Sequence, residues 1–309
     1  MSRLLLDVDA GCDDSIALLV ALARDDIDLV GVTTVAGNTT IENTTENALA
    51  ILDFAGSDVP LARGCDRPLD DELVKAEWIH GPKGLPESVR PGLLAPDAEP
   101  VDTHAVDFII ERAYEYGTDL TIAAVGPATN LAVALAKEPA LPDIVGDIYL
   151  MGGALKTTGN VTPMASFNFY VDAVAASRVV RDADPHIVGL DVTEPAYIPM
   201  TQLESLRGVS ENLDTIVEIF SFTEEEVKEK FGQAGVIASD AVLTAHLAAD
   251  ILGFEQAFVE VDTSYGPSRG ATVYDEHGVR NQPPNANVAL DIDIETYRET
   301  VLSALETFG

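Results

Sequence analysis

Short apolar runs and amphipathic segments alternate along most of the chain. Residues 4–6 have the character of a buried strand, and residues 16–22 carry the wide apolar face of a helix. The same succession recurs at 27–35 and 42–54, where a run rich in Val and Thr precedes a helical pattern. Because strands that alternate with helices are typical of α/β proteins, the pattern predicts a parallel central sheet.

The alternation continues to the end of the chain, with one long interruption. Residues 64–100 are irregular, rich in Gly and Pro, and indicate either a functional loop or a merely decorative insertion. The other predicted strands are 59–62, 120–125, 147–151, 187–189, 258–261 and 288–292, and the other predicted helices are 103–116, 201–231, 242–249, 295–308 and two that begin near 130 and 172. With 309 residues, we expect a single domain, 1–309, that carries the loop-rich insertion at about 64–100.

Charge narrows the range of partners. The chain has 18 basic and 52 acidic residues, and a net charge of −34 repels nucleic acid and anionic membranes. Acids spread along the whole chain are typical of proteins from a salt-loaded, halophilic cytoplasm. No apolar run approaches the ~18 residues that span a bilayer, and the N-terminus lacks the apolar segment of a secretory signal. We therefore expect a cytoplasmic protein.

Four carboxylates lie within eight residues where the first predicted strand turns into a helix: Asp7, Asp9, Asp13 and Asp14. Crowded anions repel one another, so a fold that places them beside its core needs a compensating positive charge. Oxygen ligands on a short loop suit Ca²⁺ or Mg²⁺ better than zinc. This stretch alone also fits a solvated acidic turn that caps the helix, whereas the spacing of an EF-hand is absent.

Polar side chains also occur near the ends of later strands. Asn38 follows the second strand, and in a parallel sheet it would share a crevice with the acidic turn. Asn160 and Asn168 offer amides in a predicted loop, and amides suit a polyhydroxylated ligand. Asp240 places another carboxylate at the start of a late helix, while His80, in the irregular segment, either reaches a substrate or is simply packed.

These residues resemble the inosine-uridine preferring, Ca²⁺-dependent nucleoside hydrolases over nearly the whole chain. The family's motif Asp-x-Asp-Pro-Gly-x-Asp-Asp appears at 7–14 as DVDAGCDD, with Ala10 in place of the proline. The other segments that match in the family's order are 33–38, 64–69, 79–81, 126–130, 150–153 and 167–168.

The resemblance implies an open, mostly parallel, Rossmann-like sheet with a Ca²⁺ site at its carboxyl edge. The implied metal ligands are Asp9, Asp14, Asp240 and the backbone carbonyl of Val125. Asp9 would also accept the proton of an attacking water, with Asn38 beside it. The implied substrate-binding residues are Asp13, His80, Met151, Asn160, Ser166, Phe167, Asn168 and Ser239. The products would be free ribose and a nucleobase, and the family is commonly assembled as a homodimer or homotetramer.

Two departures from the family pattern limit what the resemblance carries over. Ser166 stands where the family usually has the Glu of Glu-Phe-Asn. The resemblance therefore does not imply that this chain makes the family's contact to the ribose 5′-hydroxyl. Ser239 stands where the family has a His that protonates the leaving base. His80, His246 or a water are the substitutes that the chain offers, and the preferred nucleobase is not predicted.

Two other functions are compatible with parts of the sequence. A haloacid-dehalogenase-like phosphohydrolase would use Asp7 or Asp9 as nucleophile, but Ala10 and Gly11 do not fit its motif and phosphate-binding Lys and Arg are sparse. A non-catalytic sugar- or nucleoside-binding protein would explain the two serine replacements. The intact carboxylates argue against that second alternative.

Overall fold

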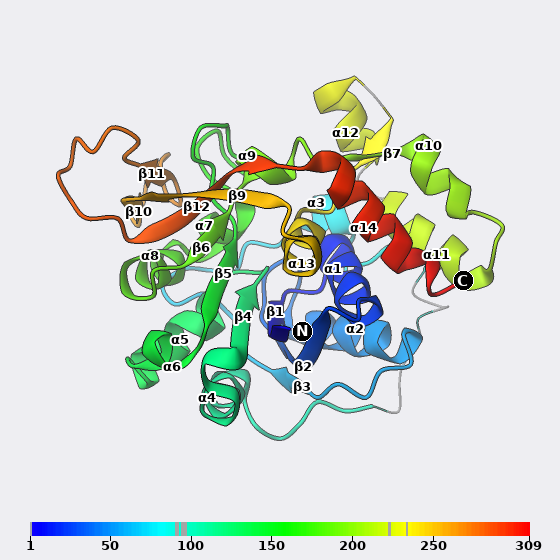
Figure 1. Cartoon of the computed structure of the whole chain (residues 1–309), viewed down its shortest axis with the longest axis horizontal. Helices are drawn as coiled ribbons and strands as arrows, with labels where there is room; N and C mark the ends of the chain where they lie inside the picture. Colours follow the sequence, from blue (N-terminus) through cyan, green and yellow to red (C-terminus); the bar gives the residue numbers. More distant parts are fainter. Residues whose placement is uncertain (1, 90–92, 94–97, 222–223, 233) are drawn as a thin grey trace.

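The computed structural model describes residues 2–89, 93, 98–221, 224–232 and 234–309. Its centre is a sheet with the strand order β3-β2-β1-β4-β5-β6-β12-β9 (Figure 1). All neighbouring strands are parallel except β12 and β9, which confirms the predicted open, mostly parallel α/β architecture. The strands are β1 (Ser2–Val8), β2 (Ile27–Thr34), β3 (Leu61–Arg63), β4 (Leu120–Ala124), β5 (Asp147–Met151), β6 (His186–Val188), β9 (Leu252–Ala257) and β12 (Ala286–Ile292).

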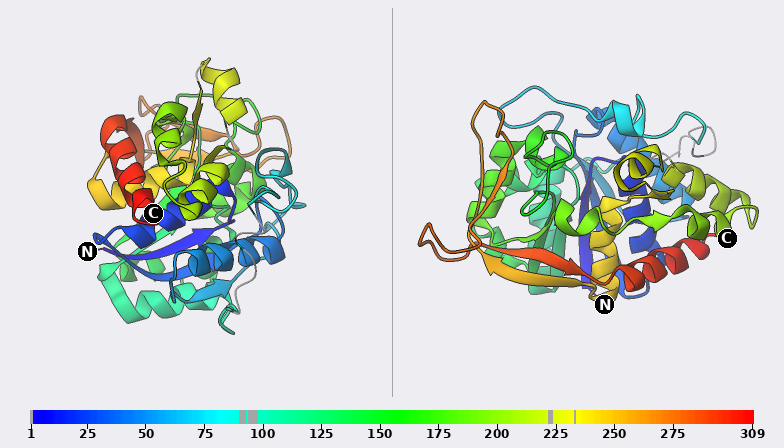
Figure 2. Two further views of the ribbon diagram at one scale, coloured as in Figure 1. Left: turned by 90° about the vertical axis from the view of Figure 1, so that its right-hand side faces the viewer. Right: turned by 90° about the horizontal axis from the view of Figure 1, so that it is seen from above.

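Helices cover both faces of the sheet (Figure 2). On one face lie α1 (Cys12–Ala23), α2 (Ile41–Phe54), α11 (Glu211–Phe220), α13 (Ser239–Ala249) and α14 (Ile294–Glu306). On the other face lie α4 (Ala105–Tyr116), α5 (Thr129–Lys137) and α8 (Ala173–Asp182). The alternation of side chains along β1 explains this division, because Leu4 and Leu6 pack into one core and Leu5 packs into the other.

Shorter elements complete the described part of the chain. They are α3 (Glu77–His80), α6 (Leu141–Ile144), α7 (Phe167–Val171), α9 (Leu190–Thr193), α10 (Met200–Leu203), α12 (Glu224–Phe231), the 3₁₀ turns Gly117–Asp119 and Glu204–Leu206, and two small antiparallel sheets formed by β7 (Ile198–Pro199) with β8 (Gly235–Val236) and by β10 (Val259–Val261) with β11 (Thr272–Tyr274). Among the described residues, none of the helices combines the length and the apolar character that crossing a bilayer requires.

The second half of the chain departs from the predicted pattern in one helical region and one strand. The helical region predicted at 201–231 is divided into α10, α11 and α12, and Gly208, with φ of 73°, interrupts it in a conformation that favours glycine. The sequence pattern also missed β9, an edge strand with four partly or fully exposed positions that lacks an apolar run. The strand predicted at 258–261 corresponds to β10, which pairs with β11 outside the main sheet.

The order of the strands fixes the position of a crevice. β1 lies between β2 and β4, so the chain moves outward in one direction through β2 and β3 and in the other through β4, β5 and β6. Loops that leave the carboxyl ends of β1 and β4 therefore diverge, and open α/β sheets bind ligands at such a switch point. Parts of the predicted insertion, at 90–92 and 94–97, lie outside the described residues.

Candidate active site

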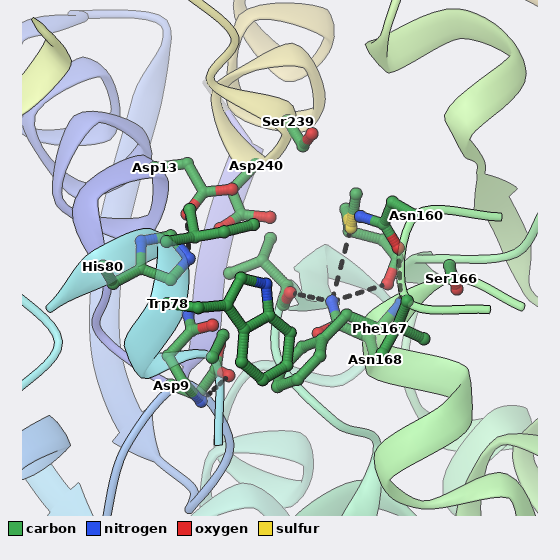
Figure 3. Close-up of a pocket in the computed structure, with 16 residues that line it drawn as sticks. Asp9, Asp13, Trp78, His80, Asn160, Ser166, Phe167, Asn168, Ser239 and Asp240 are labelled. Carbon is green, nitrogen blue, oxygen red and sulfur yellow. Dashed lines mark hydrogen bonds and ion pairs between the residues drawn. The ribbon is translucent and has the colours of Figure 1, made fainter. Parts of the chain in front are cut away.

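A pocket lies at the carboxyl ends of β1, β2, β4 and β5 (Figure 3). It brings together side chains from loops and helix starts that are far apart in the sequence. Its lining residues are Asp9, Asp13, Asn38, Ala76, Trp78, Ile79, His80, Val125, Met151, Asn160, Val161, Ser166, Phe167, Asn168, Ser239 and Asp240. Every residue that the resemblance assigned to catalysis, metal or substrate is in this set except Asp14, which is fully buried in the acidic turn next to it.

Asp14 is held in place by three N–H donors. Its Oδ1 accepts a hydrogen bond from the backbone N–H of Asp9 at 3.0 Å, and its Oδ2 accepts one from the backbone N–H of Gly11 at 2.8 Å. The side-chain amide of Asn38 donates to Oδ2 at 3.1 Å. The carboxylate lies in the first turn of α1, where the positive end of the helix dipole favours an anion.

Asp9 is positioned by the loop that follows β2. The backbone N–H of Asn38 donates to Asp9 Oδ2 at 2.7 Å. Two glycines permit this approach, because a Cβ on Gly37 would lie 2.1 Å from Oδ2 and a Cβ on Gly126 would lie 2.8 Å from Oδ1. The loops after β2 and β4 thus close tightly around this carboxylate, which is 1% exposed.

Three carboxylates form a group that fits a cation. One oxygen each of Asp13, Asp14 and Asp240 lies within 4.8 Å of the others, and Asp240 belongs to the first turn of α13. Burial and the nearby charge of Asp13 raise the pKa of Asp14 to about 6. Burial, followed by the charges of Asp13 and Asp14, holds the pKa of Asp240 well above its usual range. A divalent cation would relieve this repulsion, and an all-oxygen donor set suits a hard cation.

The cluster contains Asp14 and Asp240, which the resemblance assigns to the metal, together with Asp13, which it assigns to the substrate. Asp9, another implied metal ligand, lines the same pocket, and its backbone N–H donates to Asp14. Burial, followed by the charge of Asp14, holds the pKa of Asp9 well above its usual range. The carbonyl oxygen of Val125 lies at the pocket and accepts a hydrogen bond from the side-chain amide of Asn168.

Asp7 has a structural position. Its Oδ1 accepts hydrogen bonds from the Thr33 hydroxyl at 2.6 Å and the Asn130 amide at 2.7 Å. Burial raises its pKa to about 7. Asn130 also donates to the carbonyl of Thr34 and accepts from the backbone N–H of Cys65. Because Asp7 does not line the pocket, the structure argues against Asp7 as a phosphohydrolase nucleophile.

The amides on the opposite wall are oriented by the backbone. Phe167 and Asn168 lie in the first turn of α7, which corrects the expectation that they belong to a loop. The amide of Asn168 donates to the carbonyl of Met151 at 3.1 Å, and Asn160 Oδ1 accepts from the N–H of Phe167 at 2.8 Å. These bonds orient the Asn160 and Asn168 amides at the pocket wall.

Ser166 is engaged with the end of β5. Its hydroxyl oxygen accepts a hydrogen bond from the backbone N–H of Gly153 at 2.7 Å, and the residue is 2% exposed. Gly152 and Gly153 have φ of 149° and 92°, which allows the sharp turn that this bond closes. Ser166 thus stabilises the turn after β5.

The histidines differ in their relation to the pocket. The N–H of Cys12 donates to His80 Nδ1 at 3.2 Å, so the proton of the neutral imidazole is on Nε2, 3.9 Å from Asp13 Oδ1. Burial lowers the pKa of His80 to about 4. His246 accepts from the N–H of Leu252 and does not line the pocket, which corrects its inclusion among the substitutes for the missing acid.

The sequence interpretation missed the mouth of the pocket. Ala76, Trp78, Ile79 and Val161 line it without having been selected. Trp78 is 61% exposed, and its ring lies 6.1 Å from that of Phe167 at an interplanar angle of 79°. The available signal was that the only Trp of the chain stands two residues before His80.

Comparisons with known proteins agree with this geometry. The family model described as inosine-uridine preferring nucleoside hydrolase matches residues 4–299. The pyrimidine-specific ribonucleoside hydrolase RihB of Escherichia coli (strain UMN026) is 36% identical over 300 residues, covering 96% of this chain and 94% of that protein. The pyrimidine-specific ribonucleoside hydrolase RihA of Salmonella arizonae is 36% identical over 311 residues, covering 99% of both chains.

Solved structures show the same fold. The plant nucleoside hydrolase PpNRh1 has a TM-score of 0.91 at 30% identity and covers 98% of both chains. The purine-preferring ribonucleoside hydrolase from Gardnerella vaginalis has a TM-score of 0.91 at 28% identity, covering 99% of this chain and 98% of that one. The sequence match and the shared architecture both extend over nearly the whole length, so the chain is an enzyme that belongs to the inosine-uridine preferring nucleoside hydrolase family.

Proposed function

We propose that this enzyme hydrolyses the N-glycosidic bond of ribonucleosides and releases ribose and a nucleobase. The observation that carries the proposal is a group of four carboxylates, the buried Asp9, Asp14 and Asp240 with the half-buried Asp13, at one pocket of a nucleoside hydrolase fold. Glycosidic bonds break through a state with positive charge on the sugar, and carboxylates stabilise such a charge.

We propose Ca²⁺ as the cation of the site. Asp9, Asp14, Asp240 and the carbonyl of Val125 would hold it, and Asp13, which clusters with Asp14 and Asp240, offers a further carboxylate oxygen. When bound, the cation supplies a positive charge that binds the ribose diol and increases the acidity of a water. The donor set is made of oxygens, which Ca²⁺ prefers.

Asp9 is the proposed general base. The Asn38 N–H donates to its Oδ2, and Gly37 and Gly126 let two loops approach the carboxylate closely. A general base needs an elevated pKa to accept a proton near neutral pH, and burial acts in that direction on Asp9. Asp9 would take the proton of the water that attacks C1′.

The remaining polar groups would bind the sugar. Asp13, Asn160 and Asn168 line the pocket with groups that accept and donate hydrogen bonds to hydroxyls, and Met151 would contact the ring. Ser239 is at the start of α13 and also lines the pocket. His80 offers a neutral Nε2–H as a donor, since the lowered pKa keeps its imidazole uncharged near neutral pH.

The nucleobase has to be found by experiment, since the curated relatives are pyrimidine-specific and one of the similar structures is purine-preferring. Ribose release from a panel of purine and pyrimidine ribonucleosides, at high salt with Ca²⁺ or with a chelator, tests the proposal. We expect release from at least one nucleoside with Ca²⁺. Tight nucleoside binding by calorimetry with no release over days would instead favour a non-catalytic binding protein. A homodimer or homotetramer, a cytoplasmic location and a halophilic source stay predictions.

A further inference from the structure

Arg269 is a buried cation in a chain that has only 18 basic residues. The residue is 4% exposed, and an arginine is rarely buried this far unless it is paired. Its Nε lies 3.2 Å from Asp71 Oδ2, its Nη1 donates to the carbonyl of Thr263 at 3.1 Å, and its guanidinium carbon lies 4.8 Å from the centre of the Tyr265 ring. Neither Arg269 nor any of these partners lines the pocket, so the pocket chemistry does not account for its burial.

Asp172 is a buried carboxylate that interacts with this cation. It is fully buried between α7 and α8, and its Oδ1 accepts a hydrogen bond from the N–H of Ala175 at 2.9 Å. Its Oδ2 accepts from the Thr129 hydroxyl at 2.7 Å and from the N–H of Leu69 at 2.9 Å. Burial raises the pKa of Asp172, whereas these hydrogen bonds and the positive charge of Arg269 act in the opposite direction. Asp172 thus joins the starts of α5 and α8 to the segment that follows β3.

The loop that carries Arg269 also packs against the backbone of α7. β10 contacts α8, and both lie near α7 (Figure 1). Gly270 has φ of 76°, and a Cβ at this position would lie 2.7 Å from the Cα of Tyr170 and 2.9 Å from the carbonyl oxygen of Phe169. Only a glycine combines this conformation with so close an approach. The loop between β10 and β11 therefore supports α7 directly.

α7 in turn holds Asn168, one of the amides that line the pocket (Figure 3). The side-chain amide of Asn168 donates to the carbonyls of Val125 and Met151. Its own carbonyl accepts a hydrogen bond from the N–H of Asp172 at 3.5 Å. One turn of backbone therefore separates an amide in the pocket wall from the carboxylate that Arg269 stabilises.

We propose that Arg269 is a positioning residue for Asn168, acting through Asp172 and the backbone of α7. The inference rests on the proposed function, in which Asn168 binds the ribose. Without the guanidinium, Asp172 keeps a buried negative charge that is less well compensated. The end of α7 then shifts, and the amide loses its alignment with the sugar. Because Arg269 does not line the pocket, it is not itself a catalytic residue.

A double-mutant cycle tests whether the effect passes through Asn168. The four chains are the wild type, Arg269→Met, Asn168→Ala and the double variant, each at high salt with Ca²⁺ and a nucleoside that the wild type cleaves. We expect Arg269→Met alone to lower kcat/KM for ribose release by roughly 10- to 100-fold, because a displacement of about 1 Å can cost 100-fold. In the Asn168→Ala background the same change should cost less than about twofold more, because the contact that it supports is already absent.

A merely structural role gives a different result. Loss of folded protein would lower the rate by the same factor in both backgrounds. Equal losses in the two backgrounds, or no loss from Arg269→Met, therefore overturn the inference. Thermal unfolding verifies each chain, and Arg280→Met is the matched control, since Arg280 pairs with Glu260 of β10 and its side chain is 52% exposed. This control should match the wild type.

Two further arms keep the experiment decisive. If Arg269→Met does not fold, Arg269→Lys takes its place in the cycle, because it keeps the charge and loses the forked donors. A wild-type chain that releases no ribose from any nucleoside overturns the proposed function. The same cycle is then measured on the affinity for inosine and uridine by calorimetry, where equal losses in both backgrounds overturn the positioning role alone and the absence of any binding overturns both.

Discussion

The two ends of the pocket are built in different ways. At the buried end, the side chains of Asp9 and Asp14 receive several backbone N–H bonds from loops that leave the central strands. At the mouth, Trp78 is exposed and its ring contacts only another ring among the contacts described. Loops that leave the central strands therefore hold the buried carboxylates by backbone N–H bonds, whereas a short helix, α3, carries the exposed ring of Trp78.

The largest expected effect comes from removing the general base at the buried end. Asp9→Asn keeps a side-chain oxygen for the Asn38 N–H but cannot take a proton, so kcat should fall by roughly 10²- to 10⁴-fold. Ribose release measures this, with thermal unfolding to verify the fold. Asp26→Asn, the same change at an exposed surface carboxylate, is the control. If Asp9→Asn retained most of the activity, Asp9 would not be the general base.

The next effect concerns the cation. Asp240→Asn removes one of the three clustered carboxylates, and we expect Ca²⁺ affinity to fall by roughly 10- to 100-fold or more, a range known for weaker perturbations of metal sites. Calorimetry on metal-free protein gives the affinity, and Asp26→Asn again is the control. Unchanged affinity would show that the ion binds elsewhere.

The Ca²⁺ affinity should also depend on pH. Ca²⁺ needs ionised carboxylates, and the pKa of Asp14 is about 6 without metal. Protons therefore compete with the ion as the pH falls below this value, and affinity should drop by roughly tenfold between pH 6 and pH 5 for each proton displaced. Affinity that stays constant from pH 7 to pH 5 would contradict a site made of these carboxylates.

A smaller effect, on stability, is expected from the hydrogen bonds that Asn130 makes around Asp7. Asn130→Ala removes the bonds to Asp7, Thr34 and Cys65 and leaves buried partners unsatisfied, which costs about 1–3 kcal/mol of unfolding free energy. Denaturant unfolding at high salt measures the change. A free energy equal to that of the wild type would mean that these bonds do not stabilise the fold.

The smallest effect is expected at Ser239. It lines the pocket, but a hydroxyl is too weak an acid to protonate a leaving base, so Ser239→Ala should change kcat/KM by less than about threefold, the size of an ordinary neutral substitution. Steady-state ribose release with inosine and uridine measures it. A large loss would give Ser239 a part in the departure of the base.

The sequence predicted the buried end of the pocket better than its mouth. The acidic turn was recognised because an apolar strand and a cluster of acids are local signals, and local patterns also predicted the parallel sheet. β9 was not predicted, because most of its positions are partly or fully exposed at the sheet edge and its sequence contains no apolar run. The bond between Ser166 and Gly153 joins residues 13 positions apart across a turn, and the position of Trp78 depends on how α3 packs, so neither could be read from local patterns.

The proposed chemistry requires the pocket carboxylates to act together with a divalent cation. The most direct measurement is the rate of ribose release by metal-free protein as free Ca²⁺ is increased, at high salt and with a preferred nucleoside. We expect almost no release in chelator and saturable activation by Ca²⁺. The same rate with and without the ion would contradict it.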